Sequence, residues 1–153
     1  MSLRETFLWN CLRKCFHFFR NQNNRVREIL AEKLFSSYVI EKDLEGYSFK
    51  FTINDRCAKE WYDDSRISTK ETDFIKNYLL KENDIAVDCG AHHGLISILS
   101  SKIVGDKGKV YSFEAIPRNV IAIKKNIHIN KLNNVNIECL AVGAKNSRIN
   151  IID

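Results

Sequence analysis

A chain of 153 residues, 44% of them hydrophobic and 28% charged, has the size and composition of one folded domain, which excludes a mainly disordered protein. The net charge of +5 resides in the N-terminal segment, because residues 1–34 hold seven Lys or Arg against three acids and the remainder is nearly balanced. We therefore expect no nucleic-acid partner.

The N-terminal segment, residues 1–36, is predicted to be a basic amphipathic helical extension. Apolar residues recur at helical spacing from Leu3 to Phe19, and a second helical pattern covers residues 26–36. Such a helix either packs on protein or lies on an anionic membrane surface. Peripheral membrane contact through residues 3–20 is therefore an open alternative.

Neither a membrane span nor a secretory signal is expected. Arg13 and Lys14 interrupt the only aromatic-rich stretch. No apolar run therefore reaches the roughly 18 residues of a span, and no small-residue cleavage site follows. The five cysteines are scattered, with no C-x-x-C pair, which indicates a reduced protein without a metal site. These features predict a cytoplasmic location.

Residues 37–84 are predicted to lead into the main domain through one strand and one helix. Aromatic and β-branched residues alternate with polar ones over residues 47–53, which is typical of a half-buried strand, whereas residues 58–64 are locally ambiguous. Ser68 and Glu71 fit a capping box that opens a helix. Four large apolar residues lie on one face of that helix: Phe74, Ile75, Tyr78 and Leu79.

Residues 85–153 are predicted to form a partial cofactor-binding domain in which strands and helices alternate. The expected elements are strands over 85–88, 110–114 and 135–140, helices over 95–104 and 117–130, and a short strand over 149–152. Four β-branched residues of the second helix are expected to face inward, with Ile129 as a further candidate: Val120, Ile121, Ile123 and Ile127. The alternation predicts an α/β fold, namely a Rossmann-like parallel sheet with strand order 3-2-1.

The carboxyl ends of the strands in such a sheet meet at one edge, where ligands bind. Asp88 ends the first strand, the glycine-flanked loop Gly90–Gly94 follows it, and Glu114 ends the second strand. His92 stands in the place of the second glycine of a dinucleotide fingerprint, which disfavours an NAD-dependent oxidoreductase. Asp88 suits a ligand with an ammonium group better than one with phosphates, and Glu114 can accept the hydroxyls of a ribose.

Residues 68–143 resemble the FkbM-type branch of class I S-adenosylmethionine-dependent methyltransferases. The resemblance rests on Glu71-Thr72, Val87–Gly94, Val110–Pro117, the region of Asn126 and Asn130, and Ala141–Gly143. It implies S-adenosylmethionine as the cofactor, with the loop against its methionine half and an acid on its ribose. The cofactor-binding residues that it implies are Asp88, Gly90, Ala91, His92, Gly94 and Glu114.

By the same resemblance, the acceptor of the methyl group is a small-molecule or glycan hydroxyl, such as that of a sugar. No catalytic residue is assigned. His92 replaces the Asn that is usual in the family, and His92 and His93 are candidates for a general base that deprotonates the hydroxyl. Polarity of the loop and contact with the cofactor explain these two residues as well. The oligomeric state is not predicted.

A complete class I methyltransferase has a fourth strand beside the first, and by resemblance that strand would follow Ile152. We therefore expect this chain to be an N-terminal fragment, which binds the cofactor poorly and lacks methyl transfer. The strand over residues 85–88 would be left at a sheet edge, although its apolar run is typical of a strand buried on both faces. The alternative function is a noncatalytic Rossmann-like module that acts through its basic N-terminal helix.

Overall fold

The computed structural model covers most of the chain beyond residue 33, and the residues that it describes are 26, 34–63, 69–145, 147, 148 and 150. The chain divides into two compact units, residues 1–36 and 37–153. The predicted helix over residues 3–19, and residues 27–33 of the one over 26–36, lie outside the described residues. Residues 34–36 are not helical, so the predicted C-terminal end of the second helix is wrong. No helix in the described part is both long enough and apolar enough to cross a bilayer.

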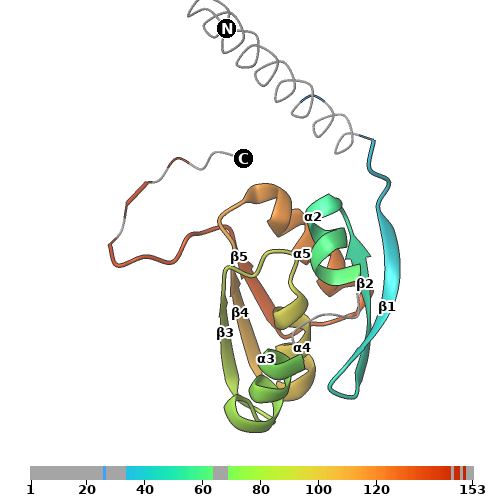
Figure 1. Ribbon diagram of the computed structural model, residues 1–153. Coiled ribbons are helices and arrows are strands. Elements are labelled where there is room, and N and C mark those ends of the chain that lie inside the picture. Colours follow the sequence, from blue (N-terminus) through green and yellow to red (C-terminus); the bar gives the residue numbers. More distant parts are fainter. Residues whose placement is uncertain (1–25, 27–33, 64–68, 146, 149, 151–153) are drawn as a thin grey trace, which may run out of the picture. The chain divides into compact units, whose positions relative to one another are not determined.

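An antiparallel hairpin opens the second unit (Figure 1). Its strands are β1 (Tyr38–Leu44) and β2 (Tyr47–Ile53). Glu45 and Gly46 between them both have positive φ, 53° and 78°, which a two-residue turn of type I′ requires. The strand predicted over residues 47–53 is confirmed. The sequence did not predict β1, because three consecutive charged residues mask its alternation.

Two short helical segments lie between the hairpin and the main sheet. The ambiguous stretch is helical, as α2 (Arg56–Ala58) followed by the π-helical turn η1 (Lys59–Asp63). The predicted lead-in helix is confirmed as α3 (Thr69–Phe74) and the π-helical turn η2 (Ile75–Leu79). Of its four apolar residues only Ile75 is buried, whereas Phe74, Tyr78 and Leu79 are exposed.

Three parallel strands form the main sheet, in the order β3-β4-β5 (Figure 1). This order and the alternation with helices confirm the predicted α/β fold. The predicted strand over 149–152 lies almost entirely outside the described residues. The elements are β3 (Ile85–Cys89), α4 (Leu95–Val104), β4 (Lys109–Phe113), α5 (Pro117–Ile129) and β5 (Val135–Glu138).

The two faces of the main sheet differ in burial. On one face, Ala86 and Val110 pack with Val104 of α4 in a buried apolar cluster. On the other face, Ile85 and Val87 are 67% and 61% exposed, and Tyr111 beside Val87 is also exposed. Within the described residues, β3 therefore lies at the sheet edge and its apolar run is buried on one face only.

The inward face of α5 differs from the prediction at one position. Val120, Ile123 and Ile127 are buried as expected, but Ile121 is 69% exposed and its prediction is wrong. At 100° per residue the buried stripe that contains Val120 and Ile123 runs through Asn119 and Asn126, not through Ile121. Polar residues thus occupy inward positions that hydrophobicity alone does not reveal.

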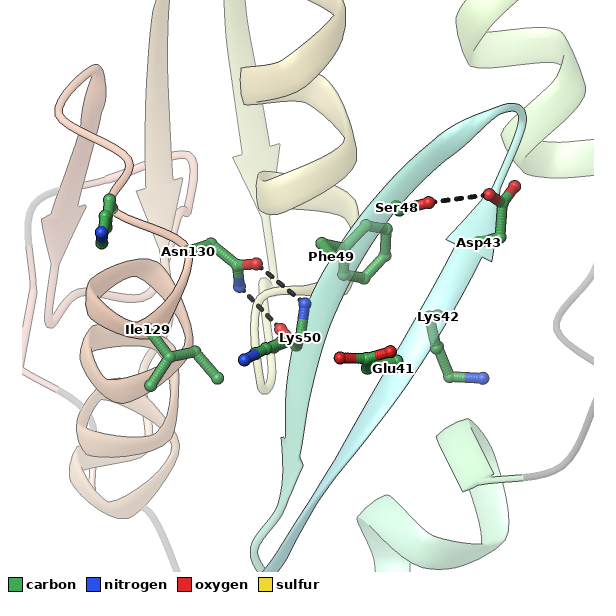
Figure 2. Close-up of a pocket in the computed structure, with 9 residues that line it drawn as sticks. Glu41, Lys42, Asp43, Ser48, Phe49, Lys50, Ile129 and Asn130 are labelled. Carbon is green, nitrogen blue, oxygen red and sulfur yellow. Dashed lines mark hydrogen bonds between the residues drawn. The ribbon is translucent and has the colours of Figure 1, made fainter.

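Asn126 of α5 and Asn130, the residue that follows the last turn of α5, connect the hairpin to the rest of the unit. Asn126 Oδ1 accepts a hydrogen bond of 2.8 Å from the backbone N–H of Thr52, and its Nδ2 donates one of 2.9 Å to the carbonyl of His93. Asn130 accepts from the N–H of Lys50 at 2.9 Å and donates to its carbonyl at 2.6 Å (Figure 2). Asn126 and Asn130 are four helical residues apart, a rise of about 6 Å. Their partners Thr52 and Lys50 are two strand residues apart, a rise of about 6.6 Å, so the two pairs of partners are in register.

Replacing Asn126 with alanine should destabilise the fold. The substitution leaves the Thr52 N–H and the His93 carbonyl without their partner in a buried site, and we expect the free energy of unfolding to fall by about 2–4 kcal/mol. Chemical denaturation measures this change. The matched control is Asn133→Ala, since Asn133 is exposed; equal stability of the two variants would contradict the clamp.

Candidate functional site

The carboxyl ends of β3 and β4 bring the predicted binding residues together. The backbone N–H groups of Gly90 and Ala91 donate to the carbonyl of Phe113 at 2.9 and 3.0 Å. The next N–H, that of His92, donates to Glu114 Oε2 at 2.8 Å. The loop after β3 is thus bound to the end of β4 through three successive amides.

The loop needs its two glycines for different reasons. Gly94 has φ +86°, which strains any other residue, and a Cβ there would lie 3.1 Å from Ile123 Cγ2, so the Ile123 side chain would have to shift. Gly90 has φ +83°, but a Cβ there would meet nothing within 4 Å, which leaves open space above the loop. His92 has φ +50°, a left-handed conformation that few residues other than glycine adopt.

Glu114 holds the loop against the start of α5. Its side chain is buried, and its second oxygen, Oε1, accepts from the Ile116 N–H at 2.9 Å and from Asn119 Nδ2 at 3.3 Å. A carboxylate offers about four acceptor positions, and three are therefore engaged. Glu114 is a structural link as well as a candidate ligand-binding group.

Asp88 lies partly buried at the end of β3. Its Oδ2 accepts a hydrogen bond of 2.6 Å from Ser97 Oγ, which also lies 2.7 Å from Ser112 Oγ. Burial raises the pKa of Asp88 above its usual value, the hydrogen bond from Ser97 opposes this, and the carboxylate of Glu114 adds to the rise. The charged form of Asp88 is thus held at a cost to the fold.

Two aromatic residues that the sequence analysis left unassigned adjoin the loop. Tyr62 Oη lies 2.7 Å from His92 Nδ1, and the ring of Trp61 lies 4.9 Å from that of His92. The rings of His92 and His93 are stacked, with centroids 4.2 Å apart and planes 5° apart. His93 Nε2 in turn lies 3.1 Å from Asp55 Oδ2. The adjacent aromatic pair after a strand and turn is a sequence signal that could have indicated this cluster.

Both histidines are held in the neutral form near pH 7. Burial lowers the pKa of His92 and the pKa of His93. The neighbouring His93 lowers the pKa of His92 further, whereas the carboxylate of Asp55 opposes the shift of both pKa values. Only 1% of the His93 side chain is exposed and its Nε2 pairs with Asp55. Of the two histidines, His92 is the more exposed.

The chain after β5 adds a third side to the site. The N–H of Glu114 donates to the carbonyl of Glu138 at 3.1 Å, so the end of β5 lies beside the end of β4. Cys139, Leu140 and Val142 follow and are exposed. Within the described residues, no three His, Cys, Asp or Glu side chains are arranged to hold a metal ion.

A cavity elsewhere in the unit lies away from this site. It has a volume of about 520 Å³ and lies between the hairpin and the end of α5 (Figure 2). Charges of both signs line it, including Glu41, Asp43, Lys50 and Lys131. None of the predicted binding residues lies in it, and the candidate site is therefore the open edge of the sheet.

The contribution of His92 and His93 to stability should fall as the pH is lowered from 7 to 5. Because the pKa values of both histidines are lower in the folded chain, the unfolded chain binds more protons in this range. Their contribution to the free energy of unfolding therefore decreases once the pH falls below about 6.5. His93→Gln removes one of the two groups and should reduce this pH dependence. Thermal melts across the range measure it. His128→Gln, at an exposed position of α5, is the control, and an equal effect of both variants would contradict the assignment.

Comparison with known proteins supports the fold. No family model matches the chain, and no curated protein matches it. Among solved structures, a Pyrococcus horikoshii protein assigned as a transferase is similar, with a TM-score of 0.50 and 21% identity over 67% of this chain and 36% of its own. The chain shares the Rossmann-like α/β fold of this structure.

Two other similar structures carry more specific names. P. horikoshii TYW2, solved in complex with MeSAdo, has a TM-score of 0.48 and 23% identity over 67% of this chain and 36% of its own. A Clostridium thermocellum protein assigned as an rRNA methylase has a TM-score of 0.46 and 23% identity over 47% of this chain and 39% of its own. The present chain therefore spans well under half the length of these proteins.

Proposed function

We propose that the chain binds S-adenosylmethionine at the carboxyl edge of its main sheet, as the cofactor-binding part of a methyltransferase. The observation that carries the proposal is the hydrogen bond from the His92 N–H to Glu114, which fixes the glycine loop beside a strand-end acid. Asp88 precedes that loop on the neighbouring strand. A nucleoside with an amino-acid tail needs an acid for its ammonium group, an acid for its ribose and a loop that it can approach closely. All three lie at this edge of the sheet.

The residues present suit the two halves of this cofactor. The open space over Gly90 lets a ligand approach the backbone. The carboxylate of Asp88, which is only partly buried, can pair with the ammonium group of the methionine half. Glu114 has about one acceptor position left for a ribose hydroxyl. We assign Ala91, His92 and Gly94 to the same site as the loop backbone and its entry into α4.

When bound, the cofactor supplies a methyl group on a positively charged sulfur. The chain's contribution is then to hold the donor in line with the acceptor oxygen, because transfer of this kind depends chiefly on alignment. His92 extends from the loop beside this site, with its Nδ1 2.7 Å from Tyr62 Oη. The glycine loop fixes the backbone from which that side chain extends.

The finer assignment to the FkbM branch, with a sugar or other small hydroxyl as the acceptor, rests on the resemblance in sequence. The similar Clostridium thermocellum protein is named as an rRNA methylase. RNA is therefore the alternative acceptor that should be tested beside a glycan. The chain spans only part of the similar proteins, so methyl transfer itself is proposed for the whole protein. The noncatalytic alternative depends on residues 3–20, which lie outside the described residues.

Ligand-dependent melting tests the cofactor directly. S-adenosylmethionine at a hundredfold excess over its Kd should stabilise the chain by about 2.7 kcal/mol and raise the Tm, whereas NAD should leave it unchanged. The reason is that only a ligand of the folded state shifts the equilibrium. A rise with NAD, or no rise with millimolar S-adenosylmethionine, would overturn the proposal.

Asp88→Asn should improve stability and weaken binding together. A raised pKa means that the folded state holds its proton more tightly than the unfolded state, so stability falls as the pH rises from about 4. Asparagine removes that cost at pH 7 and can still accept from Ser97. It also loses the charge for the ammonium group, and we expect about tenfold weaker S-adenosylmethionine binding by calorimetry.

Asp106→Asn, at an exposed loop position at the opposite edge of the sheet, is the matched control. It should change neither quantity. A Tm that falls in Asp88→Asn, or unchanged affinity, would contradict the role given to Asp88.

A further inference from the structure

The imidazole ring of His92 is held on three sides. One face is stacked on His93, with planes 5° apart. The ring of Trp61 lies 4.9 Å away at a tilt of 39°, and the Nδ1 edge meets Tyr62 Oη at 2.7 Å. Among the described residues no hydrogen-bond partner lies at Nε2, and the side chain is only partly buried. The Nε2 edge is therefore the side available to a ligand.

The contact with Tyr62 decides which nitrogen carries the proton. Burial raises the pKa of Tyr62 far above its ordinary value, so its hydroxyl keeps its proton. Among the described residues, His92 Nδ1 is the only hydrogen-bond partner of that hydroxyl, and a buried hydroxyl proton needs an acceptor, so Tyr62 donates to Nδ1. Because neutral imidazole has one donor and one acceptor, an accepting Nδ1 places the proton on Nε2. His92 thus presents an N–H to the ligand side.

We propose that Tyr62 is a positioning residue that aims the Nε2–H of His92 at the carboxylate of an amino-acid ligand. The inference rests on the proposed function and deepens it, because it assigns recognition of the carboxylate end of the methionine half. A donor is what this end of the site needs. Asp88 and Glu114, the strand-end side chains, are both carboxylates and cannot bind a third one.

The identity of residue 92 agrees with this role. An asparagine here would have an amide that always offers N–H donors and needs no partner to select a tautomer. Neutral histidine donates from Nε2 only in the tautomer whose Nδ1 is the acceptor, and a donor at Nδ1 fixes that tautomer. Tyr62 meets that condition from η1, 30 positions earlier in the chain.

Binding of two ligands to Tyr62→Phe tests the inference. S-adenosylhomocysteine has the amino-acid half and 5′-methylthioadenosine lacks it. Calorimetry should show S-adenosylhomocysteine binding about three- to tenfold more weakly to Tyr62→Phe than to the parent chain, with 5′-methylthioadenosine unchanged. Tyr111→Phe, which removes a hydroxyl from the exposed face of the sheet, should change neither.

Two further measurements separate positioning from a general structural effect. In a His92→Asn background, Tyr62→Phe should cost no affinity, because the amide needs no tautomer partner. Nitrogen-15 spectra of the parent chain should show His92 protonated at Nε2 and not at Nδ1.

Equal weakening for both ligands, or a proton on Nδ1, would overturn the inference and leave the proposed function standing. Failure of the parent chain to bind either ligand would overturn both.

Discussion

The side-chain amide of Asn126 is the interaction on which the site depends. It is buried in α5 and bonds at once to the backbone of β2 and to the carbonyl of His93. Both of its ends are used, so it fixes the distance between the hairpin and the glycine loop. The hairpin leads into α2 and η1, and η1 carries Trp61 and Tyr62 to the loop. An apolar residue at this position could fill the space but could not set that register.

Glu114 and Asp88 differ in how much each contributes to the stability of the fold. Glu114 is engaged by three donors and stabilises the loop whether or not a ligand is bound. Asp88 is held partly buried with its charge, which the folded chain tolerates at a cost. A group of that kind is typical of binding sites, where stability is given up for the complementary charge of the ligand.

Much of the main sheet could be predicted from the sequence. Each element from β3 to β5 begins within one residue of its predicted start, because apolar periodicity and glycine turns are local signals. The meeting of the glycine loop with Glu114 also followed, since parallel strands end at one edge. The contacts of Tyr62 and Asp55 did not, because they join residues 30 or more positions apart without a local pattern.

The burial of individual side chains was predicted less well. Ile121 is exposed because buried asparagines occupy the inward stripe of α5. Ile85 and Val87 look like residues of a strand buried on both faces, yet in the described residues one face is bare. The hydrophobicity of a residue indicates that it favours burial. Whether it is buried depends on the elements that pack beside it.

The most direct test of a cofactor site at this edge is a titration with S-adenosylhomocysteine followed by amide NMR spectra. We expect the shifts to concentrate at Gly90–Gly94, at Glu114 and in residues 139–143, which lie together at the ends of the three strands. Shifts centred instead on Lys50 and Asn130, in the cavity beside the hairpin, or no shifts at millimolar ligand, would contradict the account.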